Sequence, residues 1–156
     1  MDFKNIVKRL TKEKLTISTM ESCTGGAVVS SITDIEGASD VVHFSAVTYS
    51  NEAKIKMGVS KKIIDEFSVY SMEVAEEMSR SISDYAKSDI GIGITGKLNR
   101  VDKNNPYGSD NIVFISIYDK RINKNYNYLV EATLSSRHDN KQLVIDKIIE
   151  GLDKII

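Results

Sequence analysis

The sequence has few of the residues that cross-link or rigidify small folds, and no tryptophan. It has one cysteine, two histidines, one proline and no tryptophan among 156 residues. A single cysteine excludes an internal disulfide, and this small cysteine and histidine count excludes a zinc finger or ribbon. No apolar run approaches the roughly 18 residues of a membrane span, and residues 1–5 are polar. The sequence therefore predicts no transmembrane helix, no signal peptide, no structural metal and no cofactor.

An excess of charge of one sign is also missing. The chain has 21 lysines and arginines against 22 aspartates and glutamates, a formal net charge of −1. Nucleic-acid-binding domains usually carry a basic excess, so general nucleic-acid binding is not expected. The content of 41% hydrophobic and 28% charged residues is ordinary for a soluble globular protein. The length fits one domain, residues 1–156, and we expect it to be cytoplasmic.

Apolar periodicity divides the chain into alternating helices and strands. The pattern predicts helices at 2–14, 27–35, 52–57, 60–67, 72–85 and 140–156. It predicts strands at 15–20, 41–50, 89–95, 111–118 and 125–134. This alternation favours an α/β fold with parallel strand pairs, and the two late strands, joined by a short turn, make the sheet mixed. Glycines within 89–95 indicate close backbone packing.

Three polar turns follow the predicted strands, at 21–26, 48–54 and 95–96. In open α/β sheets, sites form outside the carboxyl ends of the strands. If these strands are parallel, the three turns lie at one edge of the sheet and can share one site.

The first turn combines a serine with two glycines before a helix. Ser22 could be a nucleophile, with the N–H groups of Cys23, Thr24, Gly25 and Gly26 binding an oxyanion. Alternatively, Ser22 or Thr24 is only an N-cap and the glycines form a tight turn. The pattern leaves both interpretations open.

The second turn carries a lysine. The pattern places Lys54 in the first turn of a helix capped by Asn51, where the helix dipole disfavours a cation. That place, with partial burial, would lower the lysine pKa and make the amine a base for a serine, with Tyr49 relaying a proton. Alternatively, Lys54 is a solvated surface lysine offset by Glu52, and Tyr49 is a half-buried strand aromatic.

The lone cysteine and the histidines carry weaker signals. Cys23 beside a helix N-terminus could have a lowered thiol pKa and act as a nucleophile, or it is a small buried apolar residue. His43 and His138 show no metal-ligand spacing, so neither is assigned to a metal.

Several blocks of the sequence together resemble the C-terminal domain of the competence/damage-inducible protein CinA. They are residues 21–26 (ESCTGG), 33–39 (TDIEGAS), 47–54 (VTYSNEAK), 58–59 (GV), 74–78 (VAEEM) and 94–96 (ITG). Their order and spacing agree with the family over essentially the whole chain.

The resemblance implies a three-layer α/β/α sandwich with a mixed, largely parallel sheet. Stand-alone members of the family are nicotinamide-nucleotide amidases, which hydrolyse nicotinamide mononucleotide to nicotinate mononucleotide and ammonia without metal. Carried over by position, the nucleophile is Ser22, the base is Lys54 and the assisting tyrosine is Tyr49. The resemblance also implies a homo-oligomer with a small nucleotide as substrate. From the charge and the apolar pattern, no nucleic-acid or membrane partner is expected.

One loop departs from the family pattern. After Thr95-Gly96, which we expect to orient the nucleotide, a glycine- and proline-rich loop is usual, but here the chain continues KLNRVDKNNP. Lys97, Arg100 and Lys103 could bind a phosphate through their side chains, together with Arg137, or they could simply be solvated. The change therefore leaves two alternatives to the amidase, a non-catalytic nucleotide-binding or regulatory module and an amidase of altered substrate.

Overall fold

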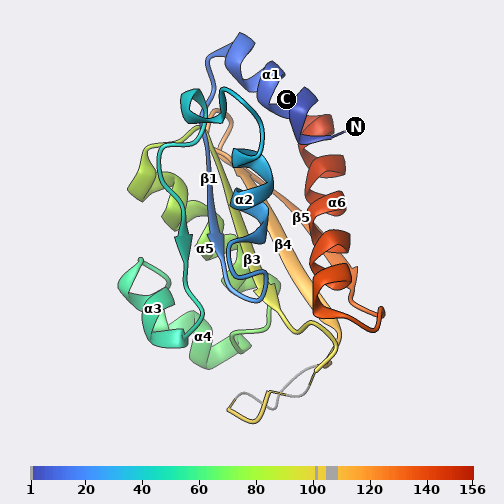
Figure 1. Cartoon of the computed structure of the whole chain (residues 1–156). Helices are drawn as coiled ribbons and strands as arrows, with labels where there is room; N and C mark the ends of the chain where they lie inside the picture. Colours follow the sequence, from blue (N-terminus) through green and yellow to red (C-terminus); the bar gives the residue numbers. More distant parts are fainter. Residues whose placement is uncertain (1, 101, 105–108) are drawn as a thin grey trace.

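The structure, a computed structural model, describes residues 2–100, 102–104 and 109–156. Within these residues, five strands form one sheet in the order β2-β1-β3-β4-β5 (Figure 1). The strands are β1 (Ile17–Glu21), β2 (Ala46–Val47), β3 (Ile90–Gly96), β4 (Ile112–Asp119) and β5 (Lys124–Glu131). β1 pairs in parallel with β2 and β3, whereas β4 pairs antiparallel with β3 and with β5. The prediction of a mixed α/β sheet is confirmed.

Helices cover both faces of this sheet. They are α1 (Phe3–Glu13), α2 (Ala27–Thr33), α3 (Asn51–Lys56), α4 (Lys61–Phe67), α5 (Met72–Ala86) and α6 (Arg137–Ile155), with a 3-10 turn η1 (Ala38–Asp40). α1, α2 and α6 contact one another and lie on one face, and α5 lies along β1, β3 and β4 on the other (Figure 1). α3 and α4 lie beside the carboxyl ends of the parallel strands, at the bottom of the view. The result is a three-layer α/β/α sandwich.

Two glycines of β3 let α5 approach the sheet closely. A Cβ atom added at Gly91 would lie 2.1 Å from the carbonyl oxygen of Ser79, and one at Gly93 would lie 2.2 Å from that of Ala75. No real Cβ atom tolerates such a distance, so α5 would have to move away from the strand. The close packing expected from these glycines is therefore present.

The predicted strand at 41–50 is mostly wrong, because only Ala46–Val47 pairs as a strand. The ladder is interrupted by a side chain: the amide of Thr19 donates to Ser45 Oγ at 2.9 Å instead of to a main-chain carbonyl. At the start of β1, the amide of Ile17 donates to the carbonyl of Val41 at 2.8 Å. β-branched composition alone does not reveal that a serine hydroxyl replaces the backbone here.

Two helix starts also differ from the prediction. α3 is capped by Ser50, whose Oγ accepts from the amide of Ala53 at 3.0 Å, so Asn51 is the first helical residue and not the cap. α6 begins at Arg137 rather than at 140. Ser136 Oγ accepts from the amide of Asp139 and caps the helix, so its first turn is made of polar residues that the apolar pattern did not include. In both cases a serine hydroxyl supplies the cap.

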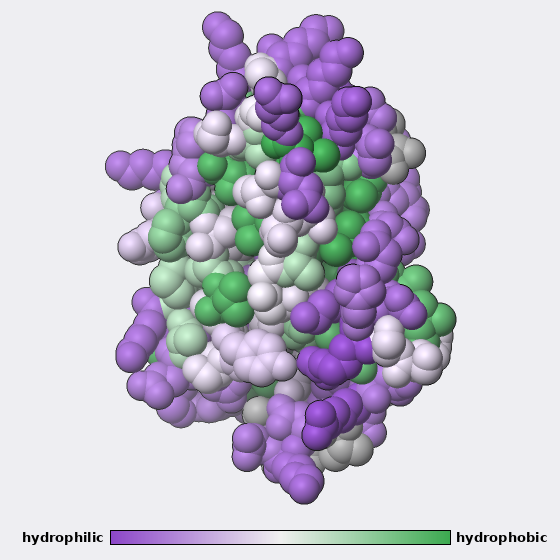
Figure 2. All heavy atoms as spheres, in the orientation of Figure 1, coloured by the Kyte–Doolittle hydropathy of each residue, from purple (hydrophilic) through white to green (hydrophobic). Residues whose placement is uncertain are grey.

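The exterior is polar at both ends of the molecule. Hydrophilic side chains gather over α1 at the top of Figure 2 and around the loop after β3 at the bottom, and hydrophobic ones show between them. None of the helices in the described ranges combines the length and the apolarity needed to cross a bilayer.

Candidate active site

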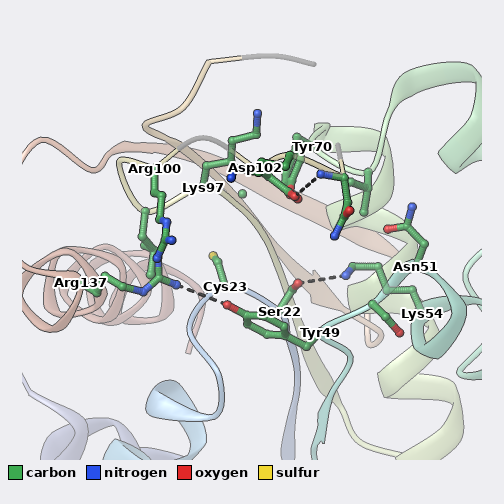
Figure 3. A pocket seen from close by; sticks show the side chains of 16 residues that line it. Ser22, Cys23, Tyr49, Asn51, Lys54, Tyr70, Lys97, Arg100, Asp102 and Arg137 are labelled. Carbon is green, nitrogen blue, oxygen red and sulfur yellow. Dashed lines mark hydrogen bonds between the residues drawn. The ribbon is translucent and has the colours of Figure 1, made fainter. Parts of the chain in front are cut away.

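The carboxyl ends of β1, β2 and β3 meet in one pocket. β1 is parallel to both of its neighbours, as the convergence of the three turns requires. The pocket, of about 940 Å³, is lined from all three turns, by Ser22 after β1, by Lys54 after β2 and by Gly96 at the end of β3 (Figure 3). This volume lies in the range of small-molecule sites.

Ser22 is held by its own main chain at the mouth of the pocket. It follows β1 directly, its amide donates to the carbonyl of Ile94 in β3 at 3.1 Å, and its carbonyl accepts from the amide of Gly25 at 2.9 Å. Both main-chain groups are thus occupied, which holds the backbone of Ser22 in place. The Oγ atom faces Lys54 (Figure 3).

Lys54 is a buried lysine with only 1% of its surface exposed. Its Nζ lies 2.9 Å from Ser22 Oγ and 2.7 Å from the carbonyl oxygen of Thr48. Among the described residues, no carboxylate lies within ion-pair distance of this nitrogen. Burial without a counter-ion lowers the pKa of Lys54 to about 8. The alternative of a solvated surface lysine is therefore excluded.

The cause of this shift differs from the one expected. Lys54 belongs to the last turn of the six-residue α3, where the helix dipole favours a cation, so placing it in the first turn was wrong. Burial, not the helix dipole, lowers the lysine pKa. At neutral pH about one tenth of such a lysine is the neutral amine, which can accept a proton from a hydroxyl.

Tyr49 and Arg137 line the pocket next to Ser22. The ring of Tyr49 is 64% exposed, and its hydroxyl accepts from the Arg137 guanidinium at 3.4 Å, a long hydrogen bond. Figure 3 shows Arg137 and Arg100 on one side of Ser22 and Lys54 on the other. The fold thereby brings Arg137, the first residue of α6, to the carboxyl end of β2, although the two lie far apart in the sequence.

Cys23 lines the same pocket, but the amine of Lys54 donates to Ser22 Oγ and to the Thr48 carbonyl rather than to the cysteine thiol. Burial raises the pKa of its thiol to about 12, the opposite of the shift expected at a helix N-terminus. The thiol is therefore a small apolar group beside Ser22.

The glycines do form a tight turn, in which the amide of Gly25 donates to the carbonyl of Ser22 at 2.9 Å, but the N-cap interpretation is wrong. Neither Ser22 nor Thr24 caps α2. Gly26 stands at the N-cap position without a side-chain hydrogen bond. The amides of Val28 and Val29 donate instead to the buried carboxylate of Glu21, a residue that the sequence analysis did not assign a role.

The α2 N-terminus is therefore already occupied by an anion. In the described part of the chain, the amides of Cys23 and Thr24 donate to no protein oxygen. Of these two residues, Cys23 lines the pocket. Its amide, directly after Ser22, is the best placed to bind an oxyanion.

Four of the expected binding residues are not part of the pocket lining, namely Thr24, Gly25, Gly26 and Thr95. The Thr95 hydroxyl is fully buried and donates to the carbonyl of Val69 at 2.9 Å. Gly96 does line the pocket, and a Cβ there would lie 2.4 Å from the carbonyl oxygen of Ile112. Thr95 and Gly96 thus hold β3 to its neighbours, and no other residue fits the place of Gly96.

The loop after Gly96 supplies cations to the pocket. Arg100 and Lys103 line it from exposed positions, whereas Lys97 is 3% exposed. Lys97 Nζ lies 3.4 Å from Asp110 Oδ1 and 4.8 Å from the centre of the Tyr70 ring. A solvated loop is thus wrong for Lys97. Val101, Asn105 and Pro106 of this loop lie outside the described residues.

Tyr70 and Asp102 are pocket residues that the pattern did not signal. The Tyr70 hydroxyl donates to the Asp102 carboxylate, and burial, followed by this hydrogen bond, raises the pKa of the tyrosine. An acidic residue in an irregular loop and a tyrosine before a helix carry no distinctive spacing, so only the fold brings them together. Within the described ranges, no group of three or more possible ligand side chains could hold a metal ion.

Comparison with known proteins identifies the family. A family model described as the CinA C-terminal domain matches residues 3–156. The chain belongs to the CinA C-terminal domain family. The resemblance noted from the sequence blocks is thereby confirmed.

Curated relatives carry CinA names. A putative competence-damage inducible protein of Caldanaerobacter subterraneus subsp. tengcongensis is 47% identical over 92 residues, 58% of this chain and 22% of that protein. A CinA-like protein of Flavobacterium psychrophilum is 44% identical over 113 residues, 70% of this chain and 26% of that protein. The chain thus matches about a quarter of the length of these relatives.

Solved structures of CinA superfamily proteins share the whole fold. The one from Escherichia coli has a TM-score of 0.84 and 25% identity, covering 99% of this chain and 90% of that chain. The one from Klebsiella pneumoniae has a TM-score of 0.85 at 20% identity, covering 97% and 93%, and shows the fold alone. The α/β/α architecture expected from the resemblance to CinA is confirmed.

Proposed function

We propose that this CinA domain is a serine amidohydrolase that converts nicotinamide mononucleotide to nicotinate mononucleotide and ammonia. The observation that carries this proposal is the 2.9 Å contact between Ser22 Oγ and the amine of Lys54, whose pKa is lowered to about 8, in an open pocket. A serine hydroxyl is a weak nucleophile unless a base takes its proton, and a neutral amine at this distance is such a base.

The reaction divides into two halves. Neutral Lys54 donates one hydrogen to the carbonyl of Thr48 and accepts the Ser22 proton with its lone pair, while Oγ attacks the carboxamide carbon. The amide of Cys23 binds the resulting oxyanion. The C–N bond then breaks, and Lys54, assisted by Tyr49, gives its proton to the departing ammonia. A nicotinoyl ester remains on Ser22. Water, deprotonated by Lys54, hydrolyses this ester and restores both residues.

The charge of the pocket supports a phosphate-bearing substrate. Among the described lining residues there are four cationic side chains besides Lys54, namely Lys97, Arg100, Lys103 and Arg137, and one carboxylate, Asp102, which already accepts from Tyr70. Lys97 also pairs with Asp110, which lies outside the lining, so the two arginines and Lys103 contribute most of the excess. This excess is local, because the chain as a whole has a net charge of −1. Arginine and lysine side chains here replace the N–H groups that a glycine loop would present to a phosphate.

Ammonia release tests the proposal. We expect the wild-type domain to release ammonia from nicotinamide mononucleotide with at least about tenfold lower KM than from nicotinamide riboside, which lacks the phosphate that the cations bind. Calorimetric binding of the nucleotide without ammonia release would instead make the domain a non-catalytic module. Ammonia from another amide, with none from this nucleotide, would assign an altered substrate, as the replaced loop allows.

The lysine pKa fixes the pH dependence. Since only the neutral amine of Lys54 accepts the serine proton, kcat/KM should rise as the pH rises through about 8 and level off above it. Below this pKa, activity should fall about tenfold for each pH unit, because the neutral fraction falls by that factor. Initial rates from pH 6 to pH 10 measure this profile. An acidic limb centred near pH 6 or below would contradict a lysine base.

A further inference from the structure

Glu21 is a fully buried carboxylate at the end of β1, directly before the nucleophile. Burying a carboxylate is costly unless its oxygens accept hydrogen bonds. Oε1 accepts from Thr24 Oγ1 at 2.7 Å and from the amide of Val28 at 3.0 Å. Oε2 accepts from the amide of Val29 at 2.9 Å and from Thr19 Oγ1 at 3.2 Å. Both oxygens are thus satisfied by donors from three separate parts of the chain.

These bonds close the turn that carries Ser22. The side chain of Glu21 reaches seven and eight residues forward to the first turn of α2, where Gly26 offers no side chain to cap the helix. The segment between these two ends is the turn at 22–26. The carboxylate of Glu21 therefore fixes the curvature of this turn, and with it the direction in which Ser22 Oγ points.

The main chain of Glu21 is linked to Lys54, the proposed base, through Thr48. The carbonyl of Glu21 accepts from the amide of Thr48 at 2.7 Å, and the carbonyl of Thr48 accepts from Lys54 Nζ at 2.7 Å. Two hydrogen bonds thus join Glu21 to the lysine, while its peptide bond joins it to the serine. Neither path involves the pocket lining beyond the two reacting side chains.

We infer that Glu21 is the positioning residue that sets the Ser22–Lys54 distance, and that its buried charge serves this alignment rather than substrate binding. The inference rests on the proposed function, because it assumes that Ser22 is the nucleophile. Glu21 contacts no substrate atom, since it does not line the pocket.

The test measures serine reactivity without a natural substrate. Glu21→Gln keeps the shape of the side chain but turns one acceptor oxygen into a donor. The bond from the amide of Val28 or Val29 is then lost, whereas the threonine hydroxyl at the same position can rotate to accept. We expect the rate at which phenylmethylsulfonyl fluoride labels Ser22, followed by mass spectrometry, to fall at least about tenfold, and kcat for the nucleotide to fall alike with KM unchanged. Thr24→Val removes a single donor to Oε1 and should lower the labelling rate less; this variant serves if Glu21→Gln does not fold.

A matched control separates positioning from stability. Ser83→Ala removes a buried hydrogen bond, to the carbonyl of Ser88 at 2.7 Å, at the other end of the sheet. It should lower the melting temperature and leave labelling at the wild-type rate. Wild-type labelling in Glu21→Gln, or no labelling of wild-type Ser22, would overturn the inference. Labelling of the wild type without nucleotide hydrolysis would overturn the proposed substrate alone and leave the alignment by Glu21 standing.

Discussion

Ser22→Ala is expected to lower kcat for ammonia release by about 10⁴-fold or more and to leave nucleotide binding nearly unchanged. The variant removes the only protein atom that forms a bond to the substrate in the proposed reaction, and residual turnover would depend on direct attack by water. The cationic side chains proposed to hold the phosphate are not changed by this substitution. Steady-state rates measure the loss of kcat, and calorimetric dissociation constants measure nucleotide binding.

The control for this variant is another serine of the same region. Ser31 in α2 donates to the carbonyl of Ala27 at 2.8 Å and does not line the pocket, so Ser31→Ala should keep wild-type kcat. Ammonia release by Ser22→Ala at more than about a tenth of the wild-type rate would exclude the nucleophilic role. The neighbouring thiol of Cys23 is buried, its pKa is raised to about 12, and Lys54 donates to Ser22 rather than to it, so it should not replace the hydroxyl.

Lys54→Met is expected to lower kcat by about 10²- to 10⁴-fold, the usual contribution of a general base. Methionine has nearly the same length, so the buried site stays filled. The loss of the hydrogen bond to the Thr48 carbonyl is offset by removal of a buried amine, and the domain should remain folded by circular dichroism. The pH dependence near 8 should disappear with the lysine.

Two variants sharpen this prediction. Lys56→Met, two residues away in α3, removes an exposed lysine that pairs with Glu52 at 3.5 Å, and it should keep wild-type kcat. Lys54→Arg retains a cation but cannot supply a neutral base at accessible pH. Activity in the arginine variant would show that positive charge near Ser22, and not proton transfer, is what the site requires.

The main features of the fold follow from sequence patterns, because apolar periodicity reports directly which face of an element is buried. α1 shows this, since Phe3, Ile6, Val7 and Leu10 recur at helical spacing and all are buried. The pattern fails where a side chain replaces the backbone in hydrogen bonding. Ser45 shortens β2 in this way, and Ser50 and Ser136 move the starts of two helices.

The sequence singled out Ser22 and Lys54, but their contact depends on the parallel pairing of β1 and β2, which no local pattern proves. Glu21 was missed although a signal was present. A carboxylate that ends an apolar strand, seven residues before the first turn of a helix without a polar cap, is a candidate to cap that helix from within the core. For Lys97 the sequence left phosphate binding and a solvated loop both open, because charge usually predicts exposure. In the structure an aspartate and an aromatic ring accommodate its buried ammonium.

The shortness of β2 has a consequence for motion at the site. This edge strand pairs with β1 through only two residue pairs, Met20 with Ala46 and Glu21 with Val47. Short edge segments open locally at a lower free energy than the centre of a sheet. Since Thr48 and Lys54 follow β2 in the chain, such an opening carries the base away from Ser22 while the other four strands stay paired. If Ser22 and Lys54 act as proposed, the fraction of time for which this edge is closed sets an upper limit on turnover.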